Sequence, residues 1–236
     1  MRRKILLPAP DTAIFRMMQG KKPRIGGWLD IDDEIIKGME PDLILTSTFV
    51  QNKITKKFRK SNMNVVSLMP TTLKGVFDSI EKIGKIIGRE KEAITLLGSM
   101  KDKINEIKNK ITTNNRPRVY IEERHKPPTV SGNWVPNLVK IAGGDYSLIK
   151  SGVHSKEVTT KQIQDYNPQI MVISICGMAN KAPKEWITKR DGWQNLDAVK
   201  NGKVYVFDDS LLNRPGPRLT IGLEELARVI HPRCFD

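Results

Sequence analysis

Cysteine is the rarest residue type with useful side-chain chemistry in this chain. Only Cys176 and Cys234 occur among 236 residues, and neither stands in a CxxC pair. Zinc sites and iron–sulfur clusters built on thiolates need several cysteines at short spacing, so the sequence argues against both. We expect Cys176 to be a buried thiol and Cys234 to be a loosely held thiol near the carboxyl end.

Long hydrophobic runs are also missing. No apolar run approaches the roughly 18 residues that span a bilayer, and residues 170–175 have only the length of a buried strand. The basic start of the chain is followed by three apolar residues before Pro8, whereas a secretory signal needs about 7–15. We therefore expect no export signal, and a cytoplasmic protein if the chain is complete.

Motifs of known enzyme classes are absent. The chain has no GxGxxG, Walker, GxSxG or HExxH motif, and no paired carboxylates stand out. His125, His154 and His231 lack the spacing of metal ligands. We expect neither an enzyme nor a resident metal or other cofactor.

Charge of one sign is in excess. The formal net charge is +14, but the basic residues are spread along the chain and aromatics make up only 6%. A groove for single-stranded nucleic acid interleaves basic and aromatic side chains, which this sequence does not do. We expect solvated lysine faces and no nucleic-acid partner. A nucleic-acid binder is the rival hypothesis, and it predicts an affinity that falls steeply with salt.

A faint internal repeat indicates the architecture. Residues 40–47 resemble residues 167–174, and each copy places a proline between a short amphipathic helix and a near-continuous apolar run. Proline ends a helix, and such runs are typical of strands buried on both faces of a parallel sheet. A further strand follows each copy. The repeat therefore predicts two similar α/β lobes.

A long amphipathic helix is expected between the two copies. Residues 90–112 place apolar side chains on one stripe, and at 1.5 Å per residue such a helix is roughly 35 Å long. That length suits a strut between lobes. We predict an N-terminal lobe at residues 1–88, a bridging helix at 89–115 and a C-terminal lobe at 116–236. Strand ends of both lobes would then point loops into one ligand cleft.

Seven segments in the same order carry a family resemblance. They are residues 24–27, 40–45, 119–122, 139–144, 193–205, 214–218 and 222–232. This set resembles the class III solute-binding proteins of ABC importers for cobalamin, ferric siderophores and haem. The resemblance implies an α/β fold of two Rossmann-like lobes on one long helix, a monomer, a permease partner and a small ligand in the cleft. It also implies an extracytoplasmic, periplasmic-type location. The ligand would be a corrinoid, a ferric chelate or haem. The first lobe is shorter than in such proteins after residue 20.

Candidate ligand-binding residues lie in loops expected at the cleft. Trp28 and Trp134 offer flat faces for a ring, Arg124 could hold an anionic group in a bidentate manner, and His125 could ligate a metal or form a hydrogen bond. We expect Trp186 and Trp193 to belong to the core. The complete set of candidates is Trp28, Gln51, Glu122, Arg124, His125, Trp134, Gly177, Met178, Asp209 and Arg214.

Docking on a permease is expected to differ from that of the family. The resemblance implies an acidic docking residue on each lobe, yet the matching positions hold Asn52 and Lys161, with Glu157 or Asp165 as alternative docking acids. A lysine would repel a permease arginine. The alternative function is therefore a cytoplasmic corrinoid- or metal-chelate-binding protein without a permease. The sequence does not distinguish among the possible ligands.

Overall fold

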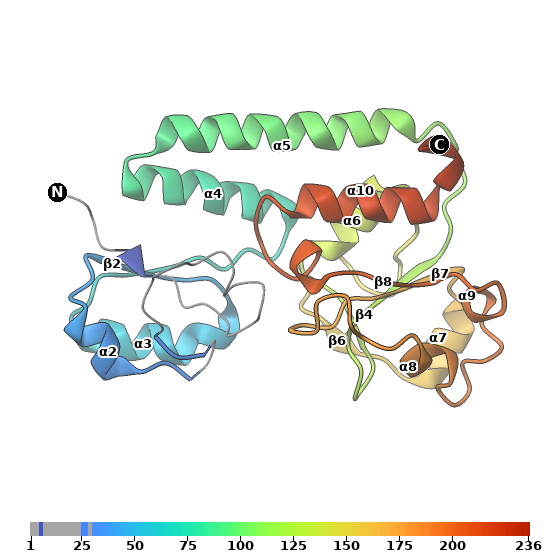
Figure 1. Ribbon diagram of the computed structural model, residues 1–236, viewed down its shortest axis with the longest axis horizontal. Helices are drawn as coiled ribbons and strands as arrows, with labels where there is room; N and C mark the ends of the chain where they lie inside the picture. The colour runs from blue at the N-terminus through green and yellow to red at the C-terminus, as the bar shows by residue number, and fades with distance from the viewer. Residues whose placement is uncertain (1–4, 7–24, 28–29) are drawn as a thin grey trace. The chain divides into compact units, whose positions relative to one another are not determined.

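The computed structural model describes residues 5–6, 25–27 and 30–236, which divide into two compact units. Unit 1 comprises Met1–Pro70 and unit 2 comprises Thr71–Asp236. The two repeat copies lie in separate sheets, with β2 (Leu43–Thr46) in a three-stranded sheet and β7 (Ile170–Ile173) in a five-stranded one (Figure 1). The prediction of two α/β units is confirmed.

Unit 1 is a small parallel sheet with short helices. Its strand order is β1-β2-β3, where β1 is Ile5–Leu6 and β3 is Val65–Ser67. The helices in its described residues are α2 (Asp33–Gly38), the 3₁₀ turn η1 (Phe49–Gln51) and α3 (Asn52–Lys60). Asp32 caps α2 because its carboxylate accepts the backbone N–H groups of Glu34 and Ile35. The core is formed by Ile25, Ile36, Ile44, Phe58 and Val65.

The sheet of unit 2 is mixed. Its order is β6-β5-β4-β7-β8, and β4 (Val119–Arg124), β7 and β8 (Val204–Val206) run parallel. The short strands β5 (Thr129–Val130) and β6 (Lys156–Glu157) are antiparallel to their neighbours. The four residues of β7 are all buried, as the apolar run predicted. Since three parallel strands end at the same edge, the loops that follow them are brought together there.

A helical hairpin is the longest feature of unit 2. It consists of α4 (Leu73–Ile87) and α5 (Glu90–Lys110), which lie side by side in Figure 1. Gly88 ends α4 in the left-handed conformation at φ 67°, which turns the chain back. Gly84 lets the helices approach closely, because a Cβ there would lie 2.5 Å from the Cβ of Ala93.

The remaining helices of unit 2 cover its sheet. They are α6 (Val135–Ile141), α7 (Thr160–Tyr166), α8 (Glu185–Thr188), α9 (Asp197–Lys200) and α10 (Leu219–Ile230), with 3₁₀ turns η2 (Asp209–Leu211) and η3 (Pro232–Cys234). Helices α6 and α10 lie on the side of the hairpin, and α7, α8 and α9 lie on the other side (Figure 1). Lys103 of α5 pairs with Glu224 of α10 at 2.9 Å. None of the helices in the described part of the chain is long and apolar enough to cross a membrane.

The division of the chain differs from the expected boundaries at residues 88–89 and 115–116. The boundary between units falls after Pro70, so both α4 and α5 belong to unit 2. The long helix is present at the predicted place and packs along its length against α4 and α10. The sequence could not show this, because an apolar stripe predicts burial of a helix face without naming the element that covers it.

Candidate functional site

A buried carboxylate organises the end of β4. The Glu122 side chain is fully buried, and the guanidinium of Arg190 donates to both of its oxygens, at 2.5 Å and 2.7 Å. Tyr120 Oη also donates to Oε2 at 2.9 Å. Burial, followed by the charge of Glu122, raises the pKa of Tyr120 well above its usual value, so the phenol keeps its proton. A buried carboxylate needs such partners, because an unpaired charge away from water is costly.

Aromatic rings hold Arg190 in place. Its guanidinium lies 4.1 Å from the centre of the Trp193 ring, which meets Tyr120 edge to face at 5.5 Å. Trp193 is fully buried, as expected from the sequence. The carboxylate of Glu122 and the ring of Trp193 together therefore fix the position of the Arg190 guanidinium.

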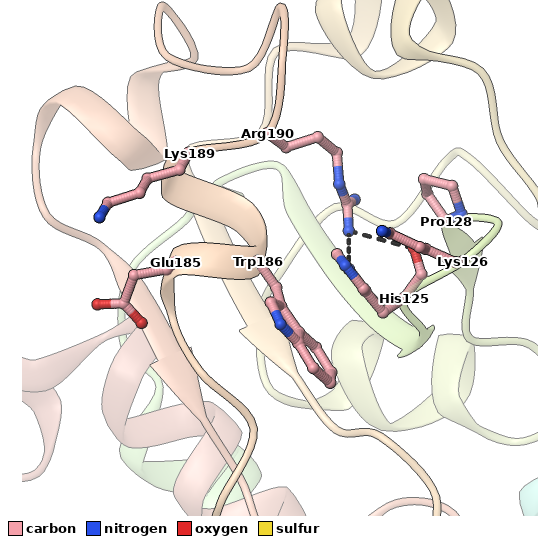
Figure 2. A pocket seen from close by; sticks show the side chains of 7 residues that line it. All are labelled: His125, Lys126, Pro128, Glu185, Trp186, Lys189 and Arg190. Atoms are coloured by element: carbon pink, nitrogen blue, oxygen red, sulfur yellow. Dashed lines mark hydrogen bonds between the residues drawn. The ribbon is translucent and has the colours of Figure 1, made fainter.

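His125 follows β4 and stands against a tryptophan. Its ring is stacked on that of Trp186, with centroids 4.3 Å apart and planes inclined by 13° (Figure 2). Nδ1 lies 2.6 Å from Nη2 of Arg190. Burial, and then the charge of Arg190, lower the pKa of His125 below its ordinary value. The imidazole is therefore favoured in its neutral form.

These side chains line an open pocket of about 380 Å³. Its lining is His125, Lys126, Pro128, Glu185, Trp186, Lys189 and Arg190 (Figure 2). Lys126, Lys189 and Glu185 are exposed, and no ion pair joins any of them to another residue of the described chain. The pocket thus combines a flat aromatic stack with exposed cationic groups, a combination that suits a planar anion.

A second group of candidates meets beyond the ends of β7 and β8. The buried carboxylate of Asp209 accepts the backbone N–H groups of Gly177 at 3.2 Å and Ala179 at 2.9 Å. Arg214 lies 3.6 Å from the same carboxylate. Asp209 therefore anchors the loop that carries Gly177 and Met178, and Gly177 adopts φ 84° there, which glycine tolerates. The sequence named these four residues as ligand-binding candidates, and the structure shows that they share one loop cluster; their contact with a ligand stays a prediction.

Besides Glu122 and Asp209, which are buried and bonded to protein partners, three further candidates occupy positions that do not suit ligand contact. Trp134 was expected in a cleft loop, but it is only 5% exposed and its indole N–H donates to the Leu212 carbonyl at 2.7 Å. Gln51 is buried, and its side chain accepts the backbone N–H of Ser47 at 2.9 Å. Arg124 pairs with Glu157 at 2.9 Å across β4 and β6 rather than facing the pocket. Trp28 lies outside the described residues.

Of the seven residues that line the pocket, the sequence named only His125 as a candidate, and Trp186 and Arg190 are the most consequential of those it missed. Trp186 was expected in the core, yet it is half-buried and lines the pocket beside His125. Arg190 follows Trp186 by four residues but lies past the end of α8, and its contact with Glu122 spans 68 positions, so no local pattern in the sequence signals it. Cys176, expected to be buried, is exposed, and its Sγ accepts a hydrogen bond from Asn213 at 3.3 Å.

The family assignment follows from the sequence match to known proteins. The model of the family described as periplasmic binding protein matches residues 9–211. This chain belongs to the periplasmic binding protein family. Two α/β units, each with a run of parallel strands, agree with that membership.

Three relatives illustrate the family. The chain is 28% identical over 235 residues to YvrC of Bacillus subtilis, an ABC transporter substrate-binding lipoprotein, covering 91% of this chain and 70% of YvrC. It is 21% identical over 204 residues to a cobalamin-binding protein of Halobacterium salinarum, covering 84% of this chain and 55% of that protein.

The third relative also has a solved structure. The heme uptake system protein IsdE of Staphylococcus aureus is 24% identical over 198 residues, which are 79% of this chain and 66% of IsdE. The structure of IsdE complexed with heme superposes with a TM-score of 0.79 over 90% of this chain and 85% of that one, at 21% identity. At this identity the likeness establishes the shared fold.

Proposed function

We propose that this chain is the solute-binding component of an ABC importer and that it binds without catalysing a reaction. It would capture a planar or chelated, net-anionic compound of the corrinoid, ferric-chelate or haem kind. Family membership supports the binding role, and the relatives named for cobalamin and heme support the ligand class. An extracytoplasmic place of action is part of the same proposal.

The stack of His125 on Trp186 beside two lysines carries the proposal. A flat ring system would gain apolar contact with the exposed part of the indole at low entropic cost. Lys126 and Lys189 would neutralise carboxylate or phosphate groups at the edge of the ring. A second contribution from Trp28 remains part of the proposal, as do contacts from the loop of Gly177 and Met178.

The test is a titration followed by tryptophan fluorescence. Purified protein is mixed with cyanocobalamin, ferric citrate or haemin, after its own visible absorption spectrum has been recorded for bound pigment. At least one compound should quench fluorescence, and Trp186→Phe should remove most of that quench. Trp134→Phe is the matched control, because Trp134 is buried elsewhere in unit 2 and should leave the binding curve unchanged. A quench that persists in Trp186→Phe would place the ligand elsewhere. No binding of any compound would refute the ligand class.

A further inference from the structure

Arg190 fixes the tautomer of His125. Its Nη2 lies 2.6 Å from Nδ1, whereas Oε1 of Glu122 is 3.6 Å from Nδ1, beyond hydrogen-bond distance. An arginine side chain has donors only, so this geometry makes Nδ1 the acceptor. A neutral imidazole carries one proton, which is then on Nε2. Arg190 is itself held by the two oxygens of Glu122, so it cannot turn away without leaving a buried carboxylate unpaired.

The protonated nitrogen of His125 is available to a ligand. The ring lines the pocket, and Nε2 has no hydrogen-bond partner in residues 30–236 or the other described segments. The buried polar atoms without a partner in the described chain are Thr48 Oγ1, Ser67 Oγ and Trp193 Nε1, so Nε2 is not sealed within the protein. Nε2–H is therefore a hydrogen-bond donor that a bound ligand can engage.

The exposed polar side chains of the pocket are mostly hydrogen-bond donors too. Lys126 and Lys189 each present an ammonium group, and Glu185 is the one carboxylate among the lining residues. Arg190 contributes positive charge, but its two terminal guanidinium nitrogens already form hydrogen bonds with Glu122 and His125. A metal ion would need an imidazole lone pair, and the lone pair of this tautomer is on Nδ1, where Arg190 occupies it.

We infer that His125 binds the ligand as a hydrogen-bond donor through Nε2–H, and that the pocket recognises an anionic oxygen group at the edge of the ligand, not its metal. This inference rests on the proposed function and names the part of the ligand that the site reads. Arg190 acts through His125 and is a positioning residue. The pocket would accept the metal-free form of a planar carboxylate as readily as its metal complex.

The tautomer is tested on the ligand-free protein. A long-range ¹H–¹⁵N spectrum of the histidine side chains at pH 7.5 should give His125 a protonated Nε2 and an acceptor Nδ1, with the signals assigned by their loss in His125→Gln. A proton on Nδ1 would overturn the inference whatever the protein binds. This measurement needs no knowledge of the ligand.

The role in binding is tested with a pair of probes, metal-free protoporphyrin IX and its iron(III) complex. Both should bind with affinities within about threefold of each other. His125→Gln, which keeps a donor, should stay close to the unaltered protein, whereas His125→Met, which offers a metal ligand but no donor, should weaken both probes by roughly tenfold or more. His154→Gln is the control, since His154 is exposed and bonds to Asn133 rather than lining the pocket.

Two results separate this inference from the proposed function. The first result is tighter binding of the iron complex than of the metal-free porphyrin, which persists in His125→Met and shows the absorption bands of a ligated iron. This result would show metal ligation and overturn the inference, while it would support a haem-type ligand. Failure of both probes, together with failure of corrinoid and ferric citrate, would refute the proposed ligand class. The nitrogen spectrum would then still decide the tautomer.

Discussion

At the residue scale, the pairing of Glu122 with Arg190 is the feature with the largest expected energetic effect. The Glu122 side chain is fully buried and the Arg190 side chain is 12% exposed. Water therefore cannot take the place of either partner if it is removed. Such pairs contribute little net stability when intact, but removing one partner leaves a buried charge uncompensated. The same pair also keeps His125 oriented toward the pocket.

Glu122→Gln should therefore lower the free energy of unfolding by about 3 kcal/mol. The measurement is chemical denaturation followed by circular dichroism. Glu157→Gln is the matched control, because Glu157 pairs with Arg124 at side-chain exposures of 63% and 55% and should cost less than about 1 kcal/mol. Equal losses in the two variants would contradict the assigned role of burial.

At the element scale, the α4–α5 hairpin depends on a glycine contact. A Cβ on Gly84 would lie 2.5 Å from the Cβ of Ala93 and 3.1 Å from the Arg89 carbonyl oxygen, closer than van der Waals contact allows. The two helices would have to separate or tilt. Gly98 on α5 has no atom within 4 Å of the position that its Cβ would take.

Gly84→Ala should destabilise unit 2 by about 1–3 kcal/mol, since overpacking outweighs the gain in helix propensity. Gly98→Ala should stabilise it by up to about 1 kcal/mol, because propensity acts there without a clash. The measurement is the thermal unfolding midpoint of both variants, which should fall for Gly84→Ala and rise for Gly98→Ala. A stabilising Gly84→Ala would mean that the hairpin is looser than the structure shows.

At the scale of the whole molecule, association with a permease depends on charges on both units. Asn52 begins α3 on unit 1, a helix that carries no acidic residue. Lys161 of α7, on unit 2, pairs with Asp165 at 3.1 Å, and Glu157 pairs with Arg124. The two acids that could replace the expected docking residues are thus partly neutralised by neighbours.

We predict weak binding to the permease encoded in the same genome, measured with the permease in lipid nanodiscs. The double variant Asn52→Glu with Lys161→Glu should bind more tightly, because it replaces repulsion of permease arginines by attraction. Asn115→Glu with Lys101→Glu makes the same change of charge at other exposed positions and should have a smaller effect. Tight, salt-sensitive binding of the unaltered protein, weakened by Glu157→Ala or Asp165→Ala, would identify those acids as the docking residues.

The sequence by itself determined the class of the fold and the family. Apolar runs after Pro41 and Pro168 predicted buried parallel strands because only a strand covered on both faces lacks polar alternation. Ordered motifs along most of the chain then indicated the family. Grouping of Gly177, Met178, Asp209 and Arg214 was also accessible, since loops after parallel strands meet at one edge.

Only the tertiary structure decided which side chains form the pocket. Arg190 reaches Glu122 across 68 positions of sequence, and that contact sets the tautomer of His125. The sequence favoured Trp134 as a ligand contact and Trp186 as a core residue, yet packing buries the first and leaves the second half-exposed. Periodicity specifies which residues share a face of one element, whereas burial depends on what the rest of the chain lays against that face.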